Sequence, residues 1–362
     1  MNALPAERDF ETPVAVYAIV AAGAAIDEAI AANAALSGLR TIACGPFAAV
    51  VGDGPTAESG GRNREELVLR LLAHQKIVEQ IMQASPVLPV KFGTVVPDEI
   101  GVYSFLERGG PAIGAAFDRL AGCVQIEILV KWDVEAVFAE IAKEQAIAGL
   151  KEKWRVHIGA PEDALRFAIG KLVKQSLDRR RASLAASLFE TLRAVAVDAI
   201  AYPATADQVA LHLVLLMKSD RMTALDRRIE DLDVTHGGRL GFRVVGPLAP
   251  YSFATVEIEI VEATALNQAM RLLGVGPSSS VAQVRLAYRR AAKSVHPDAV
   301  GAGGNAGMVA LKEACRILCL NAETGGDGRG VDETLSAGHP ILAGRSVIVS
   351  VRRQEGALDV AA

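Results

Sequence analysis

The sequence predicts an α+β fold, with two small ferredoxin-like α+β domains followed by a short all-helical segment. Strand-like and helical stretches alternate along most of the 362 residues, but without the regular βαβ repeats of a parallel sheet. No strand-like stretch leads into a Gly-rich phosphate loop, which argues against a doubly wound nucleotide-binding sheet. From Leu266 onward, short helical stretches are separated by Gly-rich loops. The order of the earlier elements suggests split βαβ units.

The first predicted domain covers residues 1–123. Its expected elements are a strand at 14–20, a helix at 26–35, an apolar strand-like run at 42–51, a helix at 64–83, a strand at 87–94, and two short helices at 98–108 and 111–121. The helix at 64–83 has the clearest pattern, because Leu67, Leu71 and Val78 recur at helical spacing and Pro86 follows its end.

The second predicted domain covers residues 124–262. Its expected elements are a strand at 124–132, a mostly helical stretch at 133–191, strands at 195–202 and 208–217, a short charged helix at 221–231, and strands at 241–246 and 254–261. The first of these strands opens with a period of two, which fits a half-buried strand. We interpret the basic run Arg179–Arg181 as a solvated helix face. We expect residues 263–322 to form a third, helical domain, and residues 323–362 to form a Gly-rich linker and tail with a last strand-like patch at 345–352.

Composition excludes several classes of protein. The chain has 38 basic and 42 acidic residues, a net charge of −4, which argues against a nucleic-acid partner. Its longest apolar stretch, Val14–Ile26, has 13 residues, whereas a membrane span needs about 20. The residues before it are acidic, the wrong sign for a secretory signal. Four scattered cysteines do not suggest a disulfide framework. We therefore expect a cytoplasmic protein that does not enter a membrane.

No catalytic or metal-binding pattern is present, so we expect no enzyme activity, no cofactor and no metal. A Gly-x-Ser-x-Gly elbow, a Walker loop and a His-Glu-x-x-His motif are all missing from the sequence. His74 lies at helical spacing beside apolar residues, which is typical of a partly buried core histidine. Cys315 and Cys319 would share one side of a helix, but no second cysteine pair stands at ligand spacing.

The most specific local pattern is the tripeptide His296-Pro297-Asp298 with the helix before it. That helix combines an apolar stripe with four cations, Arg285, Arg289, Arg290 and Lys293, and has no acidic residue between Val281 and Val295. A Gly-rich loop and a second amphipathic helix follow. Residues 264–322 thereby resemble a J domain of the DnaJ co-chaperone family. The resemblance implies that the basic helix docks on an acidic patch of a DnaK-type chaperone, and that the tripeptide promotes ATP hydrolysis by that partner. A surface turn built by Pro297 and Asp298 is the alternative interpretation.

A second resemblance covers about residues 13–262. Tyr17-Ala-Ile-Val20, the helix with His74, the segment Val87–Thr94 and the strand around Gln125 follow one another as in the gas vesicle GvpL/GvpF family. The most specific part is Gly246-Pro-Leu-Ala-Pro-Tyr-Ser-Phe253, which matches a Gly-Pro-x-x-Pro-Tyr-x-Phe signature. The family-motif residues are Leu88, Pro89, Phe92, Gly93, Gly246, Pro247, Pro250, Tyr251 and Phe253. We interpret them as structural: strand ends, a rigid turn and aromatic anchors.

This resemblance implies a minor structural or accessory protein of the gas vesicle. It would be located at the gas vesicle in the cytoplasm, would be required for vesicle assembly, and would bind the main shell protein GvpA and other gas vesicle proteins. The alternative function is a J-domain co-chaperone that recruits a DnaK-type chaperone to the hydrophobic shell protein.

Overall fold

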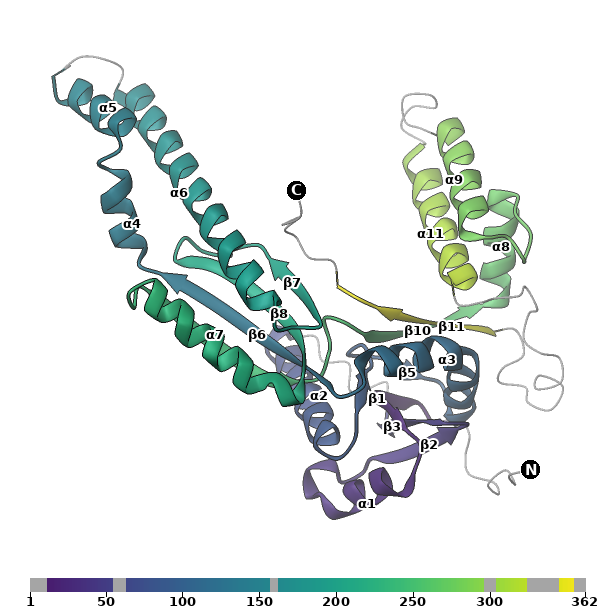
Figure 1. The fold of residues 1–362 in the computed structure, drawn as a ribbon. Helices are drawn as coiled ribbons and strands as arrows, with labels where there is room; N and C mark the ends of the chain where they lie inside the picture. Colours follow the sequence, from purple (N-terminus) through teal and green to yellow (C-terminus); the bar gives the residue numbers. More distant parts are fainter. Residues whose placement is uncertain (1–11, 55–62, 157–161, 296–303, 324–344, 355–362) are drawn as a thin grey trace. The chain divides into compact units, whose positions relative to one another are not determined.

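The computed structural model describes residues 12–54, 63–156, 162–295, 304–323 and 345–354 (Figure 1). By its internal contacts the chain divides into two units. Unit 1 contains residues 1–121 together with 254–353, and unit 2 contains residues 122–253 together with 354–362. Each unit is described separately below.

Unit 1 is built around an antiparallel sheet with the strand order β2-β3-β1-β4, to which β5 adds by pairing with β1. Its elements up to residue 121 are β1 (Val14–Ala21), α1 (Ala24–Ala32), the 3₁₀ turn η1 (Ala34–Leu36), β2 (Arg40–Cys44), β3 (Phe47–Asp53), α2 (Arg64–Ala84), β4 (Val87–Pro89), β5 (Val95–Val96) and α3 (Glu99–Leu120). The run at 42–51 that we expected to be one strand lies within the hairpin β2–β3. Gly45, with φ of 60°, makes the turn between the two strands.

Helix α3 corrects a second expectation, because it runs unbroken where two short helices were predicted. Pro111 lies inside it, and yet buried residues occur on both sides of the proline, among them Phe105 and Ile113. Their burial outweighs the local cost of the proline. Gly109 has a packing role rather than a helix-breaking one: a methyl group added there would lie 2.8 Å from Cγ1 of Val349.

Unit 2 has an antiparallel sheet with the order β7-β8-β6-β9. Its elements are β6 (Cys123–Trp132), α4 (Val134–Ile141), α5 (Gln145–Val156), α6 (Glu162–Arg193), β7 (Asp198–Tyr202), β8 (Val209–Lys218), the 3₁₀ turn η3 (Ser219–Arg221), α7 (Met222–Thr235) and β9 (Leu240–Leu248). The strand predicted at 195–202 begins only at Asp198, because Val195 and Ala196 still close the end of α6 by hydrogen bonds to Leu192 and Arg193.

The core of unit 2 lies between one face of this sheet and the helices. Ile126, Ile128 and Leu213 from the strands pack against Leu188 of α6 and Leu225 of α7. Helix α6 has 32 residues and is therefore about 48 Å long. The N-terminal half of α6 runs beside α5 (Figure 1). In this half Ile169, Leu172 and Val173 pack against the core cluster of unit 2.

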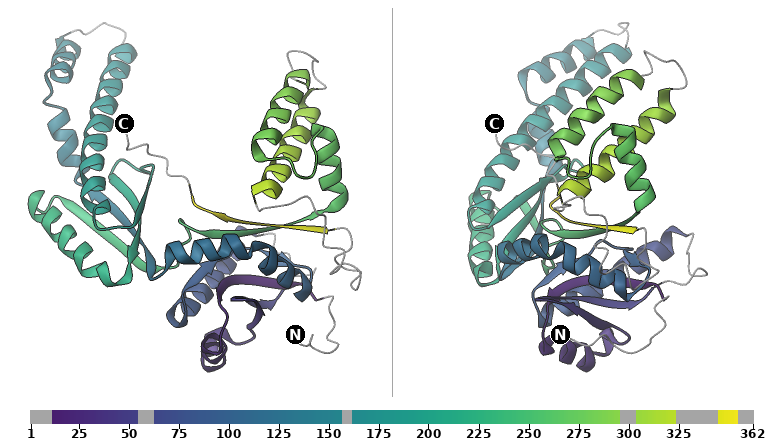
Figure 2. Two further views of the ribbon diagram at one scale, coloured as in Figure 1. Left: turned by 45° about the vertical axis from the view of Figure 1, so that its right-hand side comes forward. Right: turned by 90° about the vertical axis from the view of Figure 1, so that its right-hand side faces the viewer.

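In the described part of unit 1, helices α8, α9 and α11 occur between two paired strands. Strand β10 (Thr255–Glu262) pairs antiparallel with β11 (Arg345–Arg352) along its whole length, and α8 (Ala263–Leu273), α9 (Val281–Val295) and α11 (Gly304–Glu323) lie between them in sequence. The helices pack on one another around Leu273, Val284 and Leu311, and they stand together beside the β10–β11 ribbon (Figure 2).

The strand-like patch expected at 345–352 is confirmed, and its strand partner is β10. Residues 255–262 group with unit 1, although we expected them to close the second domain. The observed sheets are antiparallel, as an α+β fold requires. The ferredoxin-like assignment of the two domains, and the boundary between helical domain and tail, stay predictions.

Candidate functional site

The first family motif forms the end of β4 and the turn after it. Leu88, Pro89 and Val90 are buried, and β4 pairs with β1 through Leu88 and Ile19. Gly93 has φ of 82°, a conformation that side chains other than glycine rarely adopt. Phe92 is half-buried. The residues of this motif therefore shape a strand end.

His74 on α2 is the centre of an aromatic cluster above that strand end. Its ring stacks on Tyr17 of β1 at a centroid distance of 5.2 Å, and Phe92 approaches it edge-on at 5.5 Å. Its Nε2 donates a hydrogen bond of 3.2 Å to the carbonyl of Val90. Burial lowers the pKa of His74, and the hydrogen bond to Val90 opposes that shift. His74 is therefore a neutral core residue that ties α2 to β4.

Lys91 continues the connection from β4 to β10. Its backbone N–H donates a 2.9 Å hydrogen bond to the carbonyl of Val256, beside a parallel bridge between Val90 and Val256. Its Nζ lies 3.1 Å from Oε1 of Glu257. The motif thus joins the sheet of unit 1 to the ribbon that carries the helices.

The second motif lies in unit 2, at the end of β9. One extra residue stands on β9 between its pairs with Gln125 and Glu127, which is a β-bulge at Gly246 and Pro247. Gly246 has φ of 146°, and a methyl group there would lie 2.6 Å from Cδ1 of Ile126. The peptide bond between Gly246 and Pro247 is cis. Only glycine fits this close approach.

Beyond the bulge, the chain folds over the sheet face opposite the helices. Pro250 and Phe253 are buried, and Tyr251 is half-buried. The backbone N–H of Ser252 donates a 2.8 Å hydrogen bond to Oε1 of Gln125, which is itself buried. This accounts for a polar side chain inside the protein. The end of the second motif is therefore buried, and this motif belongs to unit 2 whereas the first belongs to unit 1.

The residues of the J-like segment are described in part. Arg285, Arg289, Arg290 and Lys293 are exposed on α9. They lie on the side away from Val284, Ala287 and Tyr288, which face the cluster of three helices. His296, Pro297 and Asp298 lie outside the described residues.

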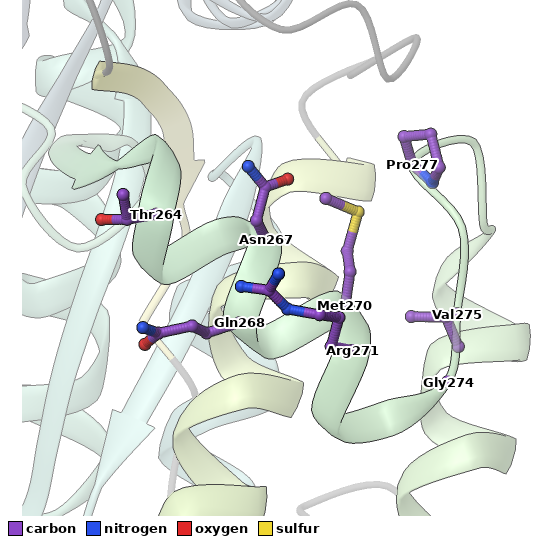
Figure 3. A pocket seen from close by; sticks show the side chains of 8 residues that line it. All are labelled: Thr264, Asn267, Gln268, Met270, Arg271, Gly274, Val275 and Pro277. Carbon is purple, nitrogen blue, oxygen red and sulfur yellow. The ribbon is translucent and has the colours of Figure 1, made fainter.

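A shallow groove of about 540 Å³ runs along α8 (Figure 3). Polar side chains one helical turn apart line it, with an apolar wall from Met270, Val275 and Pro277. The polar lining residues are Thr264, Asn267, Gln268 and Arg271. No acidic residue is among the residues that line this groove, which fits an anion or a hydrogen-bonding chain better than a cation.

Sequence reasoning missed the surface at the start of α2. Every residue from 63 to 73 is exposed. Leu67 and Leu71, whose spacing predicted the helix, are 53% and 45% exposed. Burial of α2 begins only at His74, which stacks on Tyr17 of β1, and the repeat of apolar residues gave no sign of this boundary.

The basic run on α6 also differs from its prediction as a solvated face. Arg180 pairs with Glu140 at 2.7 Å and Glu144 at 3.0 Å. Arg181 pairs with Asp207 at 3.2 Å and lies over the ring of Trp132. These arginines fix α6 against α4 and the sheet, which is a structural role.

The described residues contain no group of three or more His, Cys, Asp and Glu side chains that could hold a metal ion. None of the helices in the described ranges is both long and apolar enough to cross a membrane.

These features define a class: a mixed α+β protein of antiparallel sheets, whose motif residues build cores and turns. Comparison with known proteins identifies the family. Residues 14–255 match the sequence model of the family "Gas vesicle synthesis protein GvpL/GvpF". The chain therefore belongs to the GvpL/GvpF family, and it is a gas vesicle protein.

Two relatives agree with this. Gas vesicle protein F of Streptomyces sp. (strain CB03234) is 29% identical over 216 residues, 59% of this chain and 87% of that protein. Gas vesicle protein F of Dolichospermum flosaquae is 24% identical over 191 residues, 52% of this chain and 77% of that protein.

Two crystal structures share the fold. GvpF from Anabaena sp. PCC7120 has a TM-score of 0.56 at 21% identity, covering 67% of this chain and 97% of that one. GvpF from Microcystis aeruginosa has a TM-score of 0.51 at 18% identity, covering 67% and 98%. The helices α8, α9 and α11 lie beyond the matched residues 14–255.

Proposed function

We propose that this chain is a minor structural or accessory protein of gas vesicles that binds the main shell protein GvpA during assembly. Family membership supports a place among gas vesicle proteins, and non-enzymatic function is inferred from the family. The observation that carries the binding proposal is the exposed apolar start of α2, inside the family-matched residues.

This surface, which we call the α2 overhang, comprises residues 64–73. Its large apolar side chains are all 45–66% exposed: Leu67, Val68, Leu69, Leu71 and Leu72. The only charge between residues 67 and 73 is Arg70. A helix that is apolar on most of its circumference is normally buried, and contiguous exposed apolar surface marks an interaction site. A hydrophobic shell protein is a suitable partner for it.

Charge reversal of the overhang tests the proposal. The double substitution Leu69→Glu and Leu72→Glu keeps good helix formers at exposed positions. It is expected to weaken binding of purified shell protein at least about tenfold, because a charge buried in an apolar contact lacks a partner. Unchanged far-UV circular dichroism would show that α2 remains folded.

Val234 on α7 provides the matched control. It is 81% exposed and lies in unit 2, so Val234→Glu should leave binding unchanged. Equal binding by the wild-type chain and the overhang variant would refute the role of this surface. Vesicles of normal number and shape after gene deletion would refute the assembly function itself.

The second candidate function is that of a J-domain co-chaperone, which the exposed cations of α9 favour. Substitution His296→Gln should abolish any stimulation of a DnaK-type ATPase while leaving shell-protein binding intact. If the wild-type chain gives no stimulation and His296→Gln leaves vesicle formation normal, this alternative fails.

A further inference from the structure

Strand β9 is an open edge of the sheet of unit 2. The strand order β7-β8-β6-β9 places it at the end of the sheet, and β6 is its only partner among the described strands. It has nine residues, whereas β7 at the opposite edge has five. An edge of this length presents a row of backbone N–H and C=O groups with which a further strand can pair.

The usual protection of an edge strand is confined to one end of β9. Bulges, prolines and charged side chains normally keep a second chain from pairing with an edge. The bulge and the proline of β9 lie at residues 246–247. Within residues 240–245, which we call the β9 edge, the one charged residue is Arg243. Val244 in this segment is 43% exposed, so the β9 edge is open to pairing.

Hydrogen bonds at the two ends of β6 show which of its backbone groups face β8. Just before β6, the carbonyl of Gly122 accepts a hydrogen bond from the N–H of Ser219. At the other end, the N–H of Trp132 donates to the carbonyl of Gln208, just before β8. Backbone groups of alternate residues point to opposite sides of a strand. The even-numbered residues of β6 therefore bond toward β8, and its odd-numbered residues bond toward β9.

The same alternation fixes the outward groups of the β9 edge. The residues opposite odd-numbered residues of β6 are Gly241, Arg243 and Val245, and their backbone groups bond to β6. The N–H and C=O groups of the other three residues point to the open side of the sheet. These residues are Leu240, Phe242 and Val244.

The three outward-facing residues form a self-complementary set. When a second copy pairs antiparallel about a twofold axis at Phe242, Phe242 lies opposite its counterpart and Leu240 lies opposite Val244. All three positions become hydrogen-bonded pairs, and each pair exchanges two hydrogen bonds. A twofold dimer requires a patch that is complementary to itself in this way.

The side chains match in the same register. Leu240 and Phe242 pack with the helix-covered core of unit 2, and the period of two places Val244 on the same face. Pairing extends this apolar strip across the twofold axis. On the other face Arg243 lies opposite Gly241, so the two arginines of the dimer are not directly opposed. We propose that the β9 edge pairs with the same edge of a second copy of this chain, joining two four-stranded sheets into one.

The dimer is expected to be reversible, because the contact is small. A standard interface contains about 20–30 residues a side, whereas the β9 edge comprises residues 240–245. Sedimentation equilibrium of the full chain should therefore show an average mass that rises with protein concentration.

A lysine on the edge should weaken the dimer. Val244→Lys places a charge opposite Leu240 in the apolar strip, and the dimer should dissociate at least about tenfold more readily. Val197→Lys is the matched control, since Val197 is a 52% exposed valine of unit 2 outside β9. This control should dimerise as the wild type does.

Hydrogen exchange of the wild-type chain tests the register without a substitution. The amides of Phe242 and Val244 should exchange more slowly as the protein concentration rises, because they become hydrogen-bonded in the dimer. The amides of Gly241 and Arg243 are bonded to β6 in monomer and dimer alike, so their exchange should depend much less on concentration.

Three outcomes would overturn the proposal. The first is a chain that stays monomeric at its highest soluble concentration. The second is a dimer that Val244→Lys leaves unchanged, or whose protected amides lie outside the β9 edge, for example in the α2 overhang. The third is protection of the Phe242 and Val244 amides only after shell protein is added, which would assign the edge to a strand of that partner.

Discussion

In each unit the first strand lies between the third and the fourth, yet the long helices beside the two sheets have different surroundings. Helix α6 extends beyond its sheet, and its partly buried residues continue at a helical repeat from residue 165 to 192 because α4 and α5 pack on it. Helix α2 is also long, but its burial begins only at His74. The two sheets share one strand order, yet the apolar residues of α6 are covered by other helices of unit 2, whereas those at the start of α2 are exposed. This contrast distinguishes the proposed partner surface from a core.

The largest expected effect is a loss of stability when the packing of α5 against α6 is weakened. Ile147 of α5 is 1% exposed in the core of unit 2. Ile147→Ala should destabilise unit 2 by about 2–5 kcal/mol, the cost of a large-to-small change in a packed core. Both tryptophans, Trp132 and Trp154, belong to unit 2, so urea unfolding followed by tryptophan fluorescence reports on this unit.

Phe167→Ala is its control, since Phe167 lies on the same extension but is 76% exposed. The free energy of unfolding of unit 2 is expected to change by no more than about 0.5 kcal/mol in this variant. If both substitutions lower the free energy of unfolding of unit 2 by the same amount, α5 does not stabilise α6 and the contrast with α2 disappears.

A smaller effect concerns the residue where burial of α2 begins. Burial lowers the pKa of His74 in the folded protein, so below the ordinary pKa of about 6.5 the unfolded chain binds the proton more readily. Unit 1 should therefore lose stability as the pH falls below about 6.5, by at most about 1.4 kcal/mol per pH unit for one proton. Above that pH the contribution is constant.

Hydrogen exchange of β1 and β4 amides at pH values between 5 and 7 would measure this dependence. His74→Phe keeps an aromatic ring between Tyr17 and Phe92 but cannot be protonated, and it should flatten the profile. An unchanged profile in that variant would assign the dependence to another group.

Elements with a local sequence pattern could be predicted, whereas pairings between distant strands could not. The elements α2 and β6 could be predicted because their patterns are local: apolar residues at helical spacing for Arg64–Gln83, and alternation for Val124–Trp132. The pairing of β10 with β11 could not, because residues 263–344 separate them and no local pattern links two such strands. The hairpin β2–β3 was missed because the apolar run at 42–51 continues through the short Gly45-Pro46 turn between its strands.

In the candidate site, too, residues could be chosen from the sequence but their contacts could not be predicted. The residues of both family motifs could be chosen from sequence, but the contact of His74 with Tyr17 and Phe92 depends on the pairing of β1 with β4. The α2 overhang is the clearest case. Its leucines repeat as core residues do, and yet they are exposed, which depends on what packs against the helix rather than on the helix itself.

The smallest expected effect concerns the ion pair between Lys91 and Glu257, which joins β4 to β10. The two side chains are 61% and 33% exposed, and Glu257 also pairs with Arg352 at 3.2 Å. Lys91→Ala should therefore cost at most about 1 kcal/mol, and less in high salt, because solvent screens exposed charges. The backbone hydrogen bond from Lys91 to Val256 survives the substitution and keeps the two strands together. Urea unfolding of unit 1, followed by hydrogen exchange of β4 and β10 at low and high salt, measures the difference. A loss of several kcal/mol that salt does not reduce would mean that the side chain of Lys91, rather than the backbone of the motif, joins the sheet of unit 1 to the ribbon.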